Sequence, residues 1–294
     1  MFSTSIIEFE TPELKTEIEN NKTHYTAICF IIASKSIVYD KMAILWRKYM
    51  NKNPNIKSYF LYCETNIESD ILITHDKIIY KHEENVCPGI LLKTLAGIHV
   101  ANIYFSYDYI VRPNISSVFH FDRLIHFLKN HSKMKFVYTP PSYFSFATYD
   151  KHKHISGSNE LKTYIKNTVP RENYDKQFYF YGINYKSMHG AGYIFSKDIG
   201  EQLLQNIEHT PIHEELLKTI DDRAITILIN MFHKYDDILY TDKHIYVPFR
   251  QNDVKQLENP NIFHFRNQHA GLDGENRNID ISLMTEQIEK FYGI

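Results

Sequence analysis

Residues 25–33, YTAICFIIA, contain the longest apolar run of the chain, and the polar residues 34–36, SKS, follow it directly. A short apolar run that stops at a polar turn is typical of a strand buried on both faces of a sheet. The uninterrupted part, 27–33, is far too short to span a bilayer. We therefore expect a fully buried strand at 25–33, followed by a polar break.

Strand-like and helix-like segments alternate through the first half of the chain. Apolar runs predict further strands at 58–63, 103–111 and 135–138, and helical spacing or start signals predict helices at 42–49, 89–99 and 122–130. The second half predicts short strands at 193–195, 244–247 and 262–265, and helices that begin at 196 or 198, at 221 and at 282. This order is typical of an α/β fold with a mainly parallel sheet flanked by helices.

Residues 139–176 are the least regular part of the sequence, rich in Ser, Tyr, His and Lys, and we interpret them as an insertion or a long loop over the site. The sequence contains no internal repeat, coiled-coil heptad or linker-like change in composition. We therefore expect residues 1–294 to form a single domain with an elaborated C-terminal half.

The charge balance argues against several classes of partner. The chain has 33 Lys and Arg against 35 Asp and Glu, a net charge of −2, so no global field attracts it to nucleic acid or anionic lipid. Its three cysteines cannot close a disulfide framework, which favours a reducing compartment. The acidic N-terminal segment is unlike a signal peptide. We expect a soluble, cytoplasmic protein with no membrane span and no nucleic-acid partner.

Polar clusters lie at the ends of several predicted elements, where ligand sites of open α/β sheets occur. Ser34 follows the first strand and either contacts a ligand or belongs to a turn that caps the next helix. Lys93 lies one turn into a predicted helix, where it could reach a phosphate or a sugar. Asp108 lies inside an apolar strand and Arg112 at its exit, so each needs a partner, either a ligand or a buried Asp–Arg pair.

Two further clusters occur in the second half. Gly190, Ala191 and Gly192 either let the backbone approach a ligand closely or form an ordinary tight turn. The acidic pair at 221–222 either caps a helix or supplies a general base, because adjacent carboxylates raise one pKa. His264 and Arg266 stand at a late strand end as candidates for a metal or a diphosphate. The sequence lacks HExxH, GxSxG, GxGxxG and Walker patterns.

In this order, the clusters resemble the fringe and β-1,3-galactosyltransferase group of GT-A glycosyltransferases. The resemblance rests on segments that follow one another over about residues 27–232: AILWR (43–47), ESDIL (68–72), GILLKT (89–94), YDYIVRPNIS (107–116), GAGYIFS (190–196) and the acidic pair 221–222. Each segment is weak by itself, whereas their joint order is a stronger signal.

The resemblance implies a GT-A-like, Rossmann-like fold and transfer of a sugar, with inversion, from a UDP-sugar or a similar donor to a hydroxyl of a glycan or glycoprotein. It divides the domain into a nucleotide-binding half at about 24–138 and an acceptor or catalytic half at about 177–294. Asp222 would be the general base, with Asp221 orienting it or contacting the acceptor. The glycine loop would lie under donor and acceptor, and the donor would be held by Ser34, Asp70, Lys93, Asp108, Arg112, Asn114 and Ser116.

Two departures from the family qualify this reading. Where the family has an acidic metal-binding triplet, this chain has Asn114, Ile115 and Ser116, so we expect Mn²⁺ or Mg²⁺ to be held poorly. Arg112, with His264 or Arg266, would then stabilise the leaving group. The absence of the membrane anchor that Golgi members carry favours a cytosolic enzyme of bacterial or large-virus type.

Two other functions stay open from the sequence. The lost triplet is also consistent with a non-catalytic domain that binds a nucleotide sugar or a glycan. A nucleotidyltransferase that makes activated sugars fits less well, because residues 34–36 do not supply the usual glycine- and arginine-rich phosphate loop.

Overall fold

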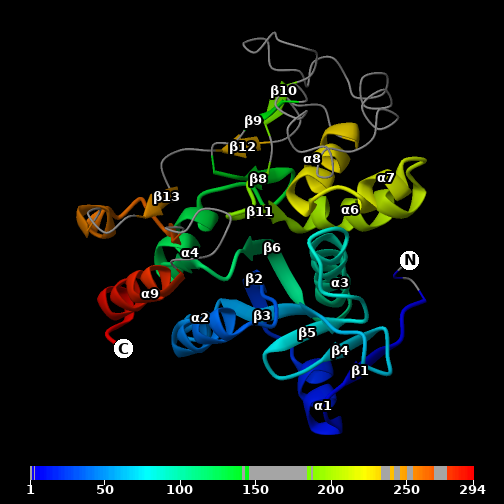
Figure 1. Cartoon of the computed structure of the whole chain (residues 1–294), viewed down its shortest axis with the longest axis horizontal. Helices are drawn as coiled ribbons and strands as arrows, with labels where there is room; N and C mark the ends of the chain where they lie inside the picture. The colour runs from blue at the N-terminus through cyan, green and yellow to red at the C-terminus, as the bar shows by residue number, and fades with distance from the viewer. Residues whose placement is uncertain are drawn as a thin grey trace.

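A computed structural model describes residues 2, 4–140, 143–145, 184–186, 188–232, 239–241, 246–249, 254–267 and 277–294. Its main element is one mixed, mainly parallel sheet (Figure 1). The strands follow one another in the order β1 (Ile7–Phe9), β4 (Ile71–Ile73), β5 (Lys77–Tyr80), β3 (Ile56–Cys63), β2 (His24–Ile32), β6 (Ser106–Pro113), β11 (Gly192–Ser196), β8 (Phe136–Tyr138) and β12 (Leu239–Thr241). The α/β class predicted from the sequence is confirmed.

Strand β2 lies in the middle of this sheet and pairs in parallel with β3 and β6. Its side chains alternate between two apolar cores. Ile28 and Phe30 belong to the core on one face, and Cys29 and Ile31 to the core on the other. Because both faces are covered, almost every position of the strand is apolar, as the sequence predicted.

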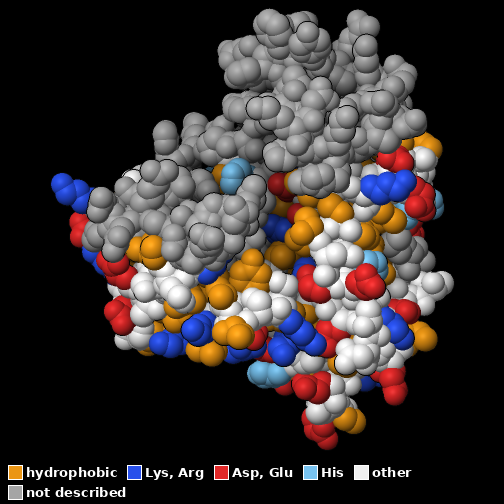
Figure 2. All heavy atoms as spheres, viewed as in Figure 1, with side chains coloured by type: hydrophobic (Ala, Val, Ile, Leu, Met, Phe, Trp, Pro, Cys, Tyr) orange, Lys and Arg blue, Asp and Glu red, His pale blue; other side chains and the backbone are white. Residues whose placement is uncertain are grey.

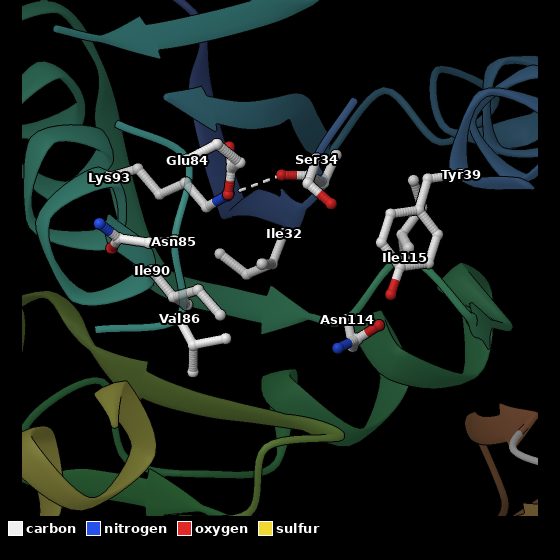
Figure 3. A pocket seen from close by; sticks show the side chains of 11 residues that line it. Ile32, Ser34, Tyr39, Glu84, Asn85, Val86, Ile90, Lys93, Asn114 and Ile115 are labelled. Carbon is white, nitrogen blue, oxygen red and sulfur yellow. Dashed lines mark hydrogen bonds and ion pairs between the residues drawn. The ribbon is translucent and has the colours of Figure 1, made fainter. Parts of the chain in front are cut away.

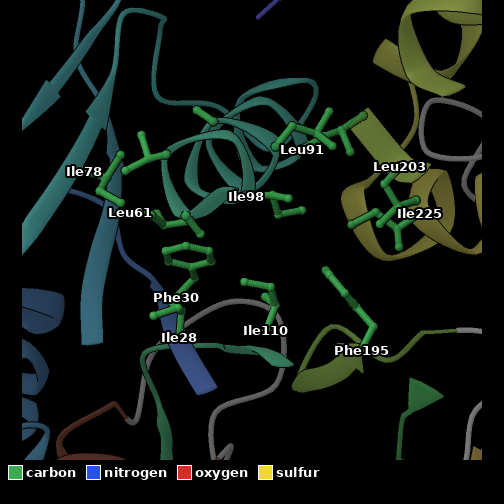
Figure 4. Close-up of a cluster of buried hydrophobic side chains, with 14 of the residues drawn as sticks. Ile28, Phe30, Leu61, Ile78, Leu91, Ile98, Ile110, Phe195, Leu203 and Ile225 are labelled. Atoms are coloured by element: carbon green, nitrogen blue, oxygen red, sulfur yellow. The ribbon is translucent and has the colours of Figure 1, made fainter. Parts of the chain in front are cut away.

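Helices cover both faces of the sheet (Figure 1). One face packs against α3 (Gly89–Tyr104), α6 (Lys197–His209), α7 (His213–Leu217) and α8 (Asp221–Phe232), and α1 (Pro12–Asn20) joins the same core near β1. Figure 4 shows this core, in which Ile98 of α3 lies between Phe30 of β2 on one side and Ile225 of α8 on the other. The other face packs against α2 (Ile37–Tyr49), α4 (Phe121–Lys129) and α9 (Arg277–Tyr292).

Smaller sheets lie beside the main one. β7 (Ser117–Phe119) pairs antiparallel with β14 (His264–Asn267), which pairs in parallel with β13 (Tyr246–Phe249). β9 (Tyr143–Ser145) pairs with β10 (Asn184–Lys186), and η5 (Val254–Glu258) is a short 3-10 helix. The β7–β14 pairing brings a late segment of the chain against the residues that follow β6.

Several element boundaries differ from those predicted. The strand predicted at 103–111 begins at Ser106 because α3 continues to Tyr104, and it runs on to Pro113. The last helix begins at Arg277 and not at 282. Among the elements without a counterpart in the prediction are β1, α1, β5, β7, α7 and β12, and most of 139–176 lies outside the described residues. Within the described part of the chain, no helix is long and apolar enough to cross a bilayer.

Trp46, the one tryptophan of the sequence, ties α2 to the segment that follows β6. Its side chain is fully buried, stacks on Tyr49 with ring centroids 4.9 Å apart, and donates from Nε1 to the carbonyl oxygen of Ile115 at 2.8 Å. Helix α2 therefore fixes the backbone at the carboxyl end of the central strands.

We expect Trp46→Phe to lower the free energy of unfolding by about 1–3 kcal/mol, because the carbonyl of Ile115 then lies buried without its donor. Urea denaturation followed by far-UV circular dichroism measures the change. Ile44→Ala is a matched control on the exposed face of the same helix, where Ile44 is 56% exposed, and should change stability by no more than about 0.5 kcal/mol. Equal stability of Trp46→Phe and the wild type would contradict this role.

Candidate functional site

The candidate site lies where β2 and β6 end and β11 begins. Ile32 forms a parallel bridge with Asn114, and the backbone N–H of Asn114 donates to the carbonyl of Ala191 at 3.1 Å. Carboxyl ends of parallel strands are the usual ligand-binding edge of an open α/β sheet. Figure 2 shows that the face in view is hollowed near its centre, where acidic and basic side chains lie among hydrophobic ones.

A pocket of about 220 Å³ opens at this edge (Figure 3). The pocket is formed by the end of β2 and the residues after it, the first turns of α2 and α3, the loop before α3, and the residues after β6. Its walls are formed by Ile32, Ala33, Ser34, Tyr39, Glu84, Asn85, Val86, Ile90, Lys93, Asn114 and Ile115. Of the donor-binding residues predicted from the sequence, Ser34, Lys93 and Asn114 are thus brought together around one cavity.

Lys93 is buried in the wall of this pocket. Its ammonium group donates to the carbonyl of Ala33 at 2.7 Å and to the carboxylate of Glu84 at 2.5 Å. Glu84 in turn accepts from the backbone N–H of Cys63 at 2.9 Å. Because a buried charge is costly unless it is paired, this arrangement holds the ends of β2 and β3 in place while presenting a lysine to the pocket.

Arg112 and Asp221 form a buried ion pair next to the pocket. Nη2 of Arg112 lies 2.5 Å from Oδ2 of Asp221, and Nη1 donates to the carbonyl of Gly190 at 3.0 Å. Tyr193, opposite Arg112 in the sheet, stacks on the guanidinium and donates to the same Asp221 oxygen at 3.3 Å. The buried Asp–Arg pair considered from the sequence therefore exists, but its acid is Asp221 and not Asp108.

Asp222 differs from its neighbour Asp221. Burial and, after it, the adjacent Asp221 carboxylate raise the pKa of Asp222 to about 7, against the opposing effect of Arg112. Its buried Oδ1 accepts no hydrogen bond from any described residue. One acid of the pair is thus fixed in an ion pair, and the other is a carboxyl group that can bind or release a proton near neutral pH.

The glycine loop fits closely around these groups. A methyl group at Gly190 would lie 3.2 Å from Oδ2 of Asp222. At Gly192, where φ is +157°, it would lie 3.0 Å from Cε1 of His264 and 3.2 Å from the carbonyl oxygen of Arg112. The carbonyl of Ala191 accepts from the Ser117 hydroxyl at 3.1 Å. Close packing thus requires glycine at position 192. At position 190, glycine places no side chain against Oδ2 of Asp222.

The β7–β14 pairing completes the cluster. His264 is buried, stacks on Phe119 and lies 3.1 Å from the Ser117 hydroxyl, and Nη1 of Arg266 donates to the Ser116 hydroxyl at 2.5 Å. Burial lowers the pKa of His264 well below its ordinary value, and the charge of Arg266 lowers it further. This histidine is therefore neutral at physiological pH.

Two predicted donor-binding residues lie outside this cluster. Asp70, just before β4, accepts from the backbone N–H of Ile6 at 2.9 Å and so links β1 to β4. Asp108 lies toward the amino end of β6, where it contacts His24 at 3.1 Å and Lys133 at 2.8 Å. Since Asp108 is on the amino-terminal half of β6, it is neither Arg112's partner nor part of the pocket wall.

Other site residues were not singled out from the sequence. His189 precedes the glycine loop, accepts at Nδ1 from the backbone N–H of Ala191 at 3.0 Å, and has its pKa lowered by burial and then by Arg266. Tyr39, Glu84 and Val86 line the pocket. His189 could have been identified from its position beside Gly190, whereas Glu84 and Val86 lie in a polar loop with no distinguishing pattern.

The side-chain oxygens of the segment after β6 do not form a suitable site for Mn²⁺ or Mg²⁺. The amide oxygen of Asn114 lies within 3.3–3.4 Å of Ser116, and the Ser116 hydroxyl accepts from Arg266. Divalent cations prefer carboxylates, and a guanidinium at this position repels them. Among the residues that the structure describes, no group of three or more His, Cys, Asp or Glu side chains could hold a metal ion.

The pKa of Asp222 leads to a prediction on stability. An acid whose pKa is higher in the folded than in the unfolded protein binds its proton more tightly when folded, so stability falls as pH rises between the two values. From 3.8 to about 7, at about 1.36 kcal/mol per pH unit, ionisation destabilises the folded protein by up to about 4 kcal/mol.

We therefore expect Asp222→Asn to match the wild type near pH 4 and to exceed its free energy of unfolding by about 2–4 kcal/mol above pH 7. Urea denaturation at a series of pH values measures both proteins. Asp222→Ser, which also lacks the carboxylate, should show the same pH dependence. Stability curves of wild type and Asp222→Asn that run parallel between pH 4 and 8 would refute the assignment.

Comparison with known proteins adds no assignment, since neither the known protein-family models nor the curated proteins match this sequence.

Proposed function

We propose that this protein transfers a sugar from a nucleoside diphosphate sugar, such as a UDP-sugar, to a hydroxyl of a glycan or glycoprotein acceptor with inversion, using Asp222 as the general base. The observation that carries the proposal is the difference between the two adjacent acids. Asp221 is held by Arg112, whereas Asp222 has a pKa of about 7 and a carboxylate oxygen that no described residue occupies.

The chemical step assigned to Asp222 is a single displacement. Its carboxylate accepts the proton of the acceptor hydroxyl while that oxygen forms a bond to the anomeric carbon. The bond from that carbon to the phosphate oxygen breaks, and the nucleoside diphosphate leaves with the electron pair. A base is most effective when its pKa lies near the working pH, which is the property that burial gives Asp222.

The position of the pocket supports binding of the donor beside this base. Asn114 lines the pocket and also bonds through its backbone to Ala191 of the glycine loop. At Gly190, the same loop lies against the carboxyl group of Asp222. A donor whose nucleoside lies in the pocket would extend past Asn114, so that its sugar lies near Gly190 and Asp222. The ordered motifs that resemble fringe-type glycosyltransferases point to the same class of donor.

We expect Asp222→Asn to lower kcat about 10²- to 10⁴-fold with little change in the KM for the donor. The assay measures UDP released from a panel of UDP-sugars, with and without glycan acceptors. For the wild type, kcat/KM should rise with pH around an apparent pKa of about 7, and the residual activity of Asp222→Asn should lack that step.

Asp221→Asn is the informative comparison for that experiment. It leaves Arg112 buried without its acid, so we expect a loss of about 3–5 kcal/mol in stability and an activity loss that follows the unfolded fraction. A folded Asp221→Asn protein without activity, beside an Asp222→Asn protein with near-normal activity, would reverse the two roles. Binding of UDP-sugars with no turnover for any donor would favour a binding domain.

A second prediction tests the location of the donor. Val86 lines the pocket and is 59% exposed, so a larger side chain there can fill the pocket without disturbing the core. We expect Val86→Trp to weaken UDP binding at least about 10-fold by isothermal titration calorimetry, a loss of about 1.4 kcal/mol or more. Ile103→Trp, at a similarly exposed position outside the pocket wall (51%), should bind UDP like the wild type. Unchanged binding by Val86→Trp would place the donor elsewhere.

A further inference from the structure

The pocket beside the ends of β2 and β6 has a wall without net charge. Among the described residues that line it, two have charged side chains, Lys93 and Glu84, and their charges are paired with each other. The remaining polar groups of the wall are neutral and belong to Ser34, Tyr39, Asn85 and Asn114. A phosphate is bound best by positive groups that are not already paired, so this wall is better suited to a neutral, hydroxyl-rich part of a ligand.

The two members of this ion pair differ in exposure. The side chain of Lys93 is 1% exposed and that of Glu84 is 26% exposed. The ammonium group donates to the carbonyl oxygen of Ala33 at 2.7 Å and to the carboxylate at 2.5 Å. Figure 3 shows Glu84 beside the end of the Lys93 side chain. A ligand in the pocket therefore reaches the carboxylate of Glu84, whereas the ammonium group is covered.

Glu84 is held in an orientation that leaves it able to accept further hydrogen bonds. Its Oε1 accepts from Lys93 at 2.5 Å, and its Oε2 accepts from the backbone N–H of Cys63 at 2.9 Å. A carboxylate has about four lone-pair sites, so each oxygen can accept one more hydrogen bond. Because one donor belongs to α3 and the other to the end of β3, the pocket offers two adjacent acceptors in a fixed position.

Two adjacent acceptors select a ligand with two adjacent donors. A phosphate presents oxygens, which a carboxylate repels. Uracil presents one N–H between two carbonyl oxygens, so it can donate to one carboxylate oxygen only. Two hydroxyls on neighbouring carbon atoms can each donate to one oxygen of the carboxylate. The wall at Glu84 therefore fits a vicinal diol.

We infer that the Glu84 carboxylate binds a vicinal diol, and that this diol consists of the 2′- and 3′-hydroxyls of the donor's ribose. The inference rests on the proposed function, which places the nucleoside of the donor in this pocket. It narrows the donor class to ribonucleotide sugars, because a 2′-deoxyribonucleotide sugar lacks one of the two hydroxyls. Lys93 then holds Glu84 in place and does not bind the diphosphate. No covalent bond is made or broken at this subsite.

Isothermal titration calorimetry of the wild type tests the inference with pairs of ligands that differ by one hydroxyl. We expect 2′-deoxy-UDP to bind at least about 10-fold more weakly than UDP, because it lacks a hydrogen bond to a charged group. Uridine and 2′-deoxyuridine should show the same ratio, since the diphosphate takes no part in this contact. UDP-glucose and UDP-2-deoxyglucose should bind alike, because the diol at Glu84 is not that of the hexose.

The informative variant removes both charges of the ion pair. Glu84→Gln alone would leave Lys93 buried without a counter-charge and would destabilise the protein. The double variant Glu84→Gln, Lys93→Met keeps similar side-chain volumes and an acceptor for the N–H of Cys63, and it buries no unpaired charge. In this variant the affinities for UDP and 2′-deoxy-UDP should differ by no more than about 3-fold, because a neutral amide forms weaker hydrogen bonds than a carboxylate.

Glu64→Gln is the matched control. Glu64 follows β3, pairs with Lys35 at 2.9 Å, and lies outside the pocket wall, so its variant should keep the wild-type preference for UDP over 2′-deoxy-UDP. Thermal unfolding of each variant shows whether it is folded. Glu84→Asp keeps the charge opposite Lys93 but shortens the side chain by one methylene group. It should lose most of the preference, and it keeps the test decisive if the double variant does not fold.

The possible failures can be told apart. Equal binding of UDP and 2′-deoxy-UDP by the wild type overturns the ribose assignment and leaves the proposed function standing. Weaker binding of UDP-2-deoxyglucose alone has the same consequence, because it assigns the diol to the hexose. A preference for UDP that persists in the folded variants of Glu84 overturns the role of this residue. Absence of binding of both UDP and uridine to the wild type overturns the proposed function as well.

Discussion

The buried contact between Arg112 and Asp221 is the interaction on which the site depends. It joins the end of β6 to the first turn of α8, across 109 positions of the sequence, and the same guanidinium holds the carbonyl of Gly190. Removal of either charge would leave the other in an apolar interior, where its solvation cost is several kcal/mol. The relative placement of β6, the glycine loop and α8 is therefore fixed by a polar contact as well as by the apolar core.

This ion pair also explains why two adjacent acids have different properties. Arg112 pairs with Asp221 and itself lowers the pKa of Asp222, but Asp221 still raises that pKa in addition to the larger effect of burial. A pair of solvated acids at a helix N-terminus would instead both be ionised and interact with the helix dipole. The interior position, and not the acidic pair alone, separates a structural carboxylate from one that can exchange a proton.

The sequence predicted the elements with strong local patterns and failed where distant contacts decide. The apolar run 25–33 and the helix 221–232 were identified because burial and N-capping acids leave local signals. The partner of Arg112 could not be identified, since nothing in the strand distinguishes Asp108 from an acid 109 residues away. Asp108 instead pairs with His24 and Lys133, which only the register of β2 and the loop after α4 bring near it.

The antiparallel direction of β11 brings the glycine loop, and with it the acidic pair 221–222, to the end of β6 at which the pocket lies. If β11 ran parallel to β6, its glycine-rich start would lie at the amino ends of the central strands, far from Asn114. Because it runs antiparallel, Gly192 pairs with Pro113 and the loop 190–192 lies at the carboxyl end of β6. Helix α6 then leads from β11, and α8 returns with Asp221 and Asp222 at its start. The order of strands thus places the acidic pair from the second half of the chain and a pocket formed by the first half around the same end of β6.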